Sequence, residues 1–267
     1  MFCYANISEP IDISKDILYK IYRLCYMCDI SYRNPSEIEN DKILYDLIQT
    51  KIFINNEKTD AQCYLFYSYK TIYICFRGTS SIKDALIDLQ TLQKTFIEKG
   101  VKVHRGFYKQ FMSIEQEIKE HIKNICKIYP SINKLCFVGH SLGGGLATLG
   151  SVWFKNMFPE KTTECYTLGS PRVGNKKFIQ LFQKIIDISY RIVDHKDPIQ
   201  YVPILPIYYH ISDSHCIYKN NLVIKKPVKG YERLVNMLKN LKYTNIVYPH
   251  KTENYINYFE SLLETSV

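Results

Sequence analysis

The sequence predicts an α/β fold, with a mostly parallel sheet covered by helices on both faces. Apolar strand-like segments alternate with amphipathic helix-like segments between residues 107 and 194, a pattern typical of parallel strands joined by helices. A short apolar strand at 135–138 also leads directly into a Gly-x-Ser-x-Gly turn at 139–143 and then into a helix. With 267 residues, of which 46% are hydrophobic, residues 1–267 are expected to form one large domain.

The first half of the chain is expected to contain one helix and two paired strands before this alternating region. Ser14 is a candidate N-cap for an amphipathic helix over 14–28, because apolar residues repeat on one face of that segment. Strands are expected at 62–69 and 71–76. The later elements are expected as a helix at 107–128 stopped by Pro130, the strand at 135–138, a helix at 142–158, a strand at 164–168, a helix at 176–186, a strand at 189–193, a proline-rich loop and a final helix at 251–263.

The net charge of the chain bears on the kind of partner that the protein could bind. The net charge of +9 comes from 35 basic and 26 acidic residues. Such a charge could favour anionic lipid surfaces or polyanions. However, the lysines are spread along the whole chain, and no run of five basic residues occurs. This distribution favours a general lysine-rich composition over a surface that binds polyanions. No nucleic-acid partner is expected.

Nothing in the sequence resembles a membrane anchor or an export signal. No run of about 18 apolar residues exists, and the first residues lack a basic segment followed by an apolar one. The nine cysteines show no regular disulfide spacing, and the Cys25–Cys28 pair lies in a helical pattern. We therefore expect mostly reduced cysteines in an intracellular protein.

Ser141 is the candidate nucleophile. A serine on so sharp a strand-to-helix turn has a strained backbone, and its neighbours must lack Cβ atoms to let strand and helix pass closely. The turn would lift the Ser141 hydroxyl out of the sheet and aim the Leu142 amide at the same point. The alternative is a glycine-rich loop with an incidental serine.

A serine hydroxyl needs a histidine base, and that histidine needs a carboxylate that orients it. Asp194 and Asp197 both follow a predicted strand, and position alone does not separate them. The histidines that follow are His210, His215 and His250, of which His250 directly precedes the last predicted helix and is the best candidate base. His140, beside the serine, is expected to turn its side chain away and to have a packing or supporting role.

Charge that develops on the substrate carbonyl oxygen needs at least two hydrogen-bond donors. The Leu142 amide is one candidate. Thr79 could supply the second through its amide and hydroxyl, because it follows a predicted strand in the segment Arg77-Gly78-Thr79.

Five blocks in this order resemble the class 3 lipases, a fungal triacylglycerol lipase-like group of α/β hydrolases. They are residues 74–79, 103–107, 138–144 and 166–175, and Asp197-Pro198 ahead of Val202-Pro203. The resemblance implies an α/β-hydrolase-type sheet, Asp197 as the acid, His250 as the base, and Thr79 and Leu142 as the oxyanion hole. It also implies a lid helix at about 81–88, with Ile82 and Leu86 on its apolar underside. The large aromatic residue of fungal lids is absent here, where Ala85 stands near its place.

The expected activity is hydrolysis of carboxylic esters in acyl lipids, through Ser141, His250 and Asp197 and an acyl-enzyme. No metal or organic cofactor is expected. The expected partner is an acyl-ester lipid, with transient contact to a membrane or lipid-droplet surface. The alternatives are a phospholipase, a non-lipid esterase or an acyltransferase with the same three residues, or a catalytically silent lipid-binding protein on the same scaffold.

Overall fold

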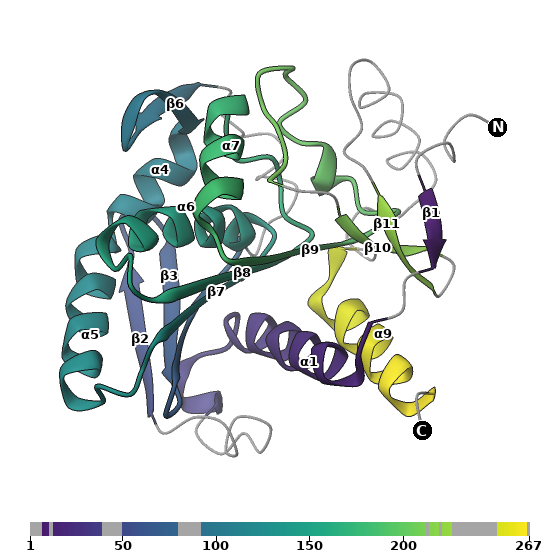
Figure 1. Cartoon of the computed structure of the whole chain (residues 1–267), viewed down its shortest axis with the longest axis horizontal. Helices are drawn as coiled ribbons and strands as arrows, with labels where there is room; N and C mark the ends of the chain where they lie inside the picture. The colour runs from purple at the N-terminus through teal and green to yellow at the C-terminus, as the bar shows by residue number, and fades with distance from the viewer. Residues whose placement is uncertain are drawn as a thin grey trace.

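The centre of the molecule is a nine-stranded sheet, seen nearly edge-on in Figure 1. The computed structural model describes residues 7–10, 13–38, 50–79, 92–211, 214–218, 221–225 and 250–265. Within these residues the strand order is β1 (Ile7–Pro10), β11 (Asn221–Lys225), β10 (Ser214–Tyr218), β9 (Ile188–Asp194), β8 (Thr162–Leu168), β7 (Lys134–His140), β4 (Thr71–Phe76), β3 (Ala61–Tyr67) and β2 (Thr50–Asn56). A separate hairpin pairs β5 (Gln93–Phe96) with β6 (Glu98–His104).

The five central strands β4, β7, β8, β9 and β10 run parallel, and at each edge two further strands extend the sheet through antiparallel pairing. The parallel centre confirms the predicted fold class. Parallel neighbours need long crossovers, which the helices supply, whereas short connections allow the antiparallel pairing of β2, β3 and β4. The strands at 7–10, 50–56, 214–218 and 221–225 were not predicted, because they are short or mix polar with apolar residues.

Helices cover both faces of this sheet (Figure 1). On one face lie α4 (Arg105–Met112), α5 (Glu115–Ile128), α6 (Leu142–Met157) and α7 (Lys176–Ile185). On the other face, α1 (Lys15–Ile30) packs against α9 (Thr252–Thr265). Two helices that are far apart in the sequence, α1 and α9, therefore pack together beneath the sheet.

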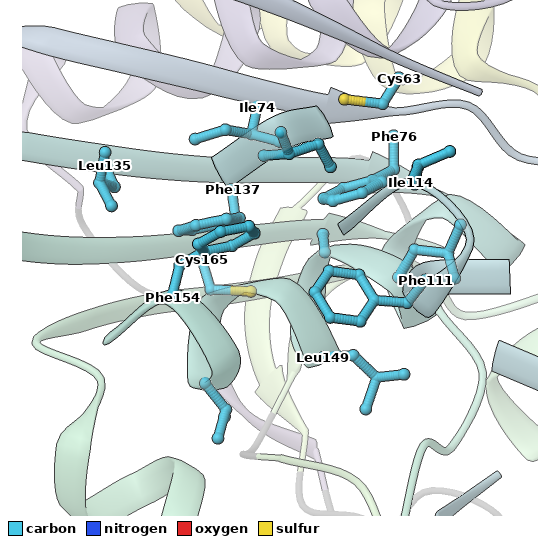
Figure 2. Close-up of a cluster of buried hydrophobic side chains, with 14 of the residues drawn as sticks. Cys63, Ile74, Phe76, Phe111, Ile114, Leu135, Phe137, Leu149, Phe154 and Cys165 are labelled. Carbon is cyan, nitrogen blue, oxygen red and sulfur yellow. The ribbon is translucent and has the colours of Figure 1, made fainter. Parts of the chain in front are cut away.

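Each face has its own apolar core, because successive strand residues point to opposite sides. Phe137 of β7 packs in the core under α6, together with Phe76, Phe111 and Phe154 (Figure 2). Its neighbour Val138 belongs to the core under α1 and α9. A fully buried phenylalanine contributes about 1.5–3 kcal/mol relative to an exposed one, so both cores hold β7 firmly in place.

The helix predicted at 107–128 is two helices, and this part of the prediction was wrong. Ser113 ends α4: its hydroxyl bonds back to the carbonyl of Gln110 at 2.7 Å, and its own carbonyl accepts from Nδ2 of Asn56 at 3.1 Å. Serine side chains compete with helical hydrogen bonds in this way. The apolar periodicity continues across the break, which is why the pattern alone suggested one helix.

No helix among the described residues is both long and apolar enough to span a bilayer.

Candidate active site

Ser141 lies at the junction of β7 and α6, at the carboxyl edge of the central strands. Its φ and ψ are 58° and −129°, a conformation that L residues rarely adopt. The Ser141 amide donates to the carbonyl of Leu168 in β8 at 2.9 Å, which fixes the turn to the neighbouring strand. Strain of this kind costs about 1–3 kcal/mol and persists where the surroundings enforce it, often at functional sites.

Two glycines let this turn form. A methyl group on Gly139 would lie 2.1 Å from the carbonyl oxygen of Gly143, inside the turn itself. A methyl group on Gly143 would lie 2.3 Å from the carbonyl oxygen of Phe76 in β4. The backbones of β4, β7 and α6 therefore approach too closely for any side chain at these two positions.

His250 and Asp197 form a buried pair. Nδ1 of His250 donates to Oδ2 of Asp197 at 2.7 Å, and both side chains have no exposed surface. The other carboxylate oxygen, Oδ1, accepts the amide of Ile199 at 2.8 Å. With its proton on Nδ1, the neutral His250 ring carries its lone pair on Nε2. This buried atom has no hydrogen-bond partner among the described residues, so the Ser141 hydroxyl does not donate to it in this structure.

Tyr255 supports the pair from α9. Its hydroxyl donates to Oδ2 of Asp197 at 3.3 Å and accepts the amide of Asp194 at 3.1 Å. Burial and the nearby Asp197 carboxylate raise the pKa of Tyr255 well above its usual value, so the hydroxyl keeps its proton. The carboxylate of Asp197 is thus held by three donors.

Asp194 has a different position, with its carboxylate in the turn that follows β9. Its Oδ1 accepts the amide of Lys196 at 2.7 Å, and its carbonyl accepts the amide of Asp197 at 3.0 Å. These bonds form the turn after β9 that carries Asp197 inward to His250. Of the two candidate acids, the structure brings Asp197 to the histidine.

The other two candidate bases, His210 and His215, and the neighbouring His140 lie in different surroundings. His210 is buried and bonds through Nε2 to the carbonyl of Gln200 at 2.5 Å. His215 lies in β10 and its ring packs on Tyr190 at 4.6 Å. His140 turns away from Ser141, as expected: its Nδ1 lies 2.8 Å from the hydroxyl of Tyr32, and its Nε2 donates to the carbonyl of His250.

The two candidate oxyanion donors flank the serine. Leu142 begins α6, so its amide belongs to the first helical turn, where amides lack acceptors within the helix and the helix dipole favours negative charge. Thr79 is partly buried and follows β4, the parallel neighbour of β7. A methyl group on the adjacent Gly78 would lie 3.2 Å from Cβ of Ser141, so this loop lies against the nucleophile turn.

The predicted lid, with Ile82 and Leu86, lies outside the described residues. Within the part of the chain that the structure describes, no three His, Cys, Asp or Glu side chains are grouped as metal ligands. The arrangement suits acyl transfer by a serine, with a histidine base, a buried acid and backbone donors beside the nucleophile.

A comparison with known families gives a match in the same region. Residues 73–207 match the family described as lipase (class 3). The chain belongs to the class 3 lipase family. The matched segment contains Thr79, Ser141, Leu142 and Asp197, whereas His250 lies beyond it.

Curated relatives of this class 3 lipase include fungal enzymes. The lipase of Rhizomucor miehei is 34% identical over 141 residues, covering 51% of this chain and 38% of the relative. A secreted mono- and diacylglycerol lipase of Malassezia globosa is 30% identical over 170 residues, covering 60% of this chain and 56% of the relative. The chain thus matches less than two thirds of the length of these relatives.

Solved structures support the fold over nearly the whole chain. A lipase from Rhizopus microsporus superposes with a TM-score of 0.76 at 22% identity, covering 91% of this chain and 89% of that structure. The Rhizomucor miehei triacylglyceride lipase gives a TM-score of 0.73 at 24% identity, covering 90% and 97%. The shared fold therefore extends well beyond residues 73–207.

Sequence reasoning missed the hydroxyls of Tyr32 and Tyr255. Both tyrosines lie on helix-rich segments at opposite ends of the chain, and among 23 tyrosines neither has a local motif that marks it. Tyr255 follows His250 by little more than one helical turn, which is the one signal that could have suggested a shared site.

Proposed function

We propose that this class 3 lipase hydrolyses carboxylic esters of acyl lipids with Ser141 as the nucleophile. The observation that carries the proposal is the buried 2.7 Å hydrogen bond between His250 and Asp197, close to a strained serine turn. A buried carboxylate that orients a histidine is the arrangement that activates a serine hydroxyl. The family and the acyl-glycerol lipases among its relatives support the same reaction.

The proposed reaction has two halves. His250 takes the Ser141 proton through Nε2 while the serine attacks the ester carbonyl, and it then passes the proton to the leaving alcohol. Asp197 keeps the proton of the neutral ring on Nδ1 and stabilises the imidazolium. The amides of Thr79 and Leu142 bind the oxyanion, a contribution of about 3–4 kcal/mol for one such donor. Water, activated by His250, then releases the fatty acid and frees Ser141.

A fluorophosphonate probe tests the nucleophile directly, because it phosphonylates activated serines. Wild-type protein should label, and Ser141→Ala should not. Ser151→Ala is the matched control: this buried serine bonds to the carbonyl of Thr148 within α6 and lies outside the proposed site. Equal weak labelling of wild type and Ser141→Ala would refute the catalytic proposal and favour a silent lipid-binding protein.

An ester panel tests the substrate class. It should contain mono-, di- and triacylglycerols of short and long chains, a phospholipid and a soluble non-lipid ester, below and above micelle formation. Preference for acylglycerols supports the proposal. Preference for the phospholipid or the soluble ester would assign the same residues to a phospholipase or an esterase, and acyl transfer to added alcohols would assign an acyltransferase.

We also propose that the protein acts inside the cell, with transient contact to a membrane or lipid-droplet surface. No disulfide joins the eight cysteines among the described residues, and seven of them are buried, which suits a reducing compartment. Fractionation of cells that express the full chain would test this location, and recovery only from the medium would refute it.

A further inference from the structure

A chain of hydrogen bonds runs behind the candidate active site and uses none of its reacting atoms. Gly78 lies against the Tyr32 oxygen, and the Tyr32 hydroxyl bonds to Nδ1 of His140 at 2.8 Å. Nε2 of His140 then donates to the main-chain carbonyl of His250. We call these contacts the Tyr32–His140 relay. It joins four segments that are distant in the sequence: the loop after β4, the end of α1, the serine turn and the segment that carries the base.

The chemistry of the partners fixes the direction of each bond. A carbonyl oxygen only accepts, so Nε2 of His140 must carry a proton. Burial and the neighbouring His250 ring, 4.4 Å away, lower the pKa of His140 well below its usual value, so the ring is neutral. A neutral ring with its proton on Nε2 has an acceptor at Nδ1, so Tyr32 donates to it.

Each contact lies next to a group with a proposed role in the reaction. Gly78 precedes Thr79, and a methyl group on Gly78 would lie 2.2 Å from the Tyr32 oxygen, so the loop is seated directly on this hydroxyl. His140 precedes Ser141. The bonded carbonyl belongs to His250 itself, and it fixes the backbone of the base, while Asp197 fixes its ring.

We propose that Tyr32 and His140 are positioning residues, which hold the Thr79 loop and the backbone of His250 in register with Ser141. The inference rests on the proposed function, because it assigns these two residues to the same reaction. Neither exchanges a proton or forms a bond in the proposed reaction. Their effect on the rate comes through geometry, since small displacements of catalytic groups can cost about 100-fold in rate.

The decisive variant is Tyr32→Phe, which removes one hydroxyl and keeps the ring. Its kcat should fall roughly 10-fold to 100-fold, the range found when a group that orients a catalytic residue is lost, and KM should change less than about twofold. Tyr166→Phe is the matched control. It removes the hydroxyl of a buried tyrosine in β8, outside the relay, and should keep a kcat close to that of the wild type.

His140 provides an independent pair of variants. His140→Ala removes both bonds, whereas His140→Gln keeps an N–H donor that can reach toward the carbonyl of His250. Glutamine should therefore restore part of the kcat and of the fluorophosphonate labelling rate that alanine loses. A purely structural role predicts instead that both variants lower the melting temperature without separating in kcat.

The tautomer of His140 can be read without any activity, from two-bond ¹H–¹⁵N NMR spectra of the wild-type protein at pH 6 to 8. A proton on Nε2 alone is expected, and a charged ring or a proton on Nδ1 would overturn the relay. A Tyr32→Phe enzyme with wild-type kcat and labelling rate would also overturn it. Failure of wild-type protein to label at Ser141 would instead refute the proposed function, and the NMR result would still report on the hydrogen bonds.

Discussion

Nδ1 of His250 lies 2.7 Å from Oδ2 of Asp197, and neither side chain has any exposed surface. Asp194, only three residues earlier, uses its carboxylate to close the turn that directs Asp197 inward.

The different positions of Asp194 and Asp197 give a paired mutational test. Asp197→Asn should lower kcat/KM by about 10³–10⁴-fold, because an amide favours the wrong histidine tautomer. Asp194→Asn should lower it by less than about tenfold, since an asparagine oxygen can still accept the Lys196 amide. Steady-state hydrolysis of a soluble ester measures both, and a near-normal Asp197→Asn enzyme would contradict the assignment.

Tyr255→Phe should affect both stability and activity. The hydroxyl bridges the amide of Asp194 and the carboxylate of Asp197. Its loss leaves a partly buried amide without this acceptor, and a buried unsatisfied donor typically costs about 1–3 kcal/mol. We expect the free energy of unfolding to fall by about 1–2 kcal/mol, measured by urea denaturation, with a several-fold lower kcat. Tyr69→Phe, at a highly exposed tyrosine, is the control and should change neither quantity.

Much of the candidate active site could be predicted, because the serine turn depends on residues that are close together in the sequence. The turn at Ser141 needs glycines in fixed places, and Gly139 and Gly143 stand there because backbone atoms lie too close for side chains. The choice between Asp194 and Asp197 could not be derived from the residues alone, because one short turn decides which carboxylate faces inward. The hydrogen bond of Tyr32 could not be predicted either, since its partner His140 is 108 residues away in the sequence.

Replacement of Ser141, the proposed nucleophile, should reveal the strain in the turn. Ser141 has a φ of 58°, which glycine adopts freely and alanine does not. Ser141→Gly relieves strain of about 1–3 kcal/mol, and the extra freedom of glycine in the unfolded chain offsets about 0.5–1 kcal/mol. Ser141→Gly should therefore be more stable than Ser141→Ala by about 1 kcal/mol in urea denaturation. Equal stability of the two inactive variants would mean that the turn is not strained.

A fall in pH should lower the stability of the folded protein, partly because His215 binds a proton more readily in the unfolded chain. Burial and the nearby Arg191 lower the pKa of His215 from 6.5 to about 4. The unfolded chain therefore binds a proton below pH 6.5 that the folded protein does not bind until about pH 4, so stability is lost as the pH falls through this window. One such proton changes the unfolding free energy by up to about 1.4 kcal/mol per pH unit.

The check is urea denaturation of wild type and His215→Gln at pH 7 and pH 5. The variant lacks this titration, so its stability should fall less between the two pH values. His121→Gln, at a partly exposed histidine of α5, is the control and should retain the wild-type difference. A His215→Gln protein with an unchanged pH dependence would show that His215 does not titrate in this window.

The packing of α1 against α9 has a consequence for the order in which the protein becomes reactive during translation. In a nascent chain Tyr32, Ser141 and Asp197 are made before His250, which follows them in the sequence. A serine without its base is a poor nucleophile. The proposed site should therefore remain chemically silent until α9 has docked beneath the sheet, so that docking of this helix, rather than synthesis of Ser141, makes the serine reactive.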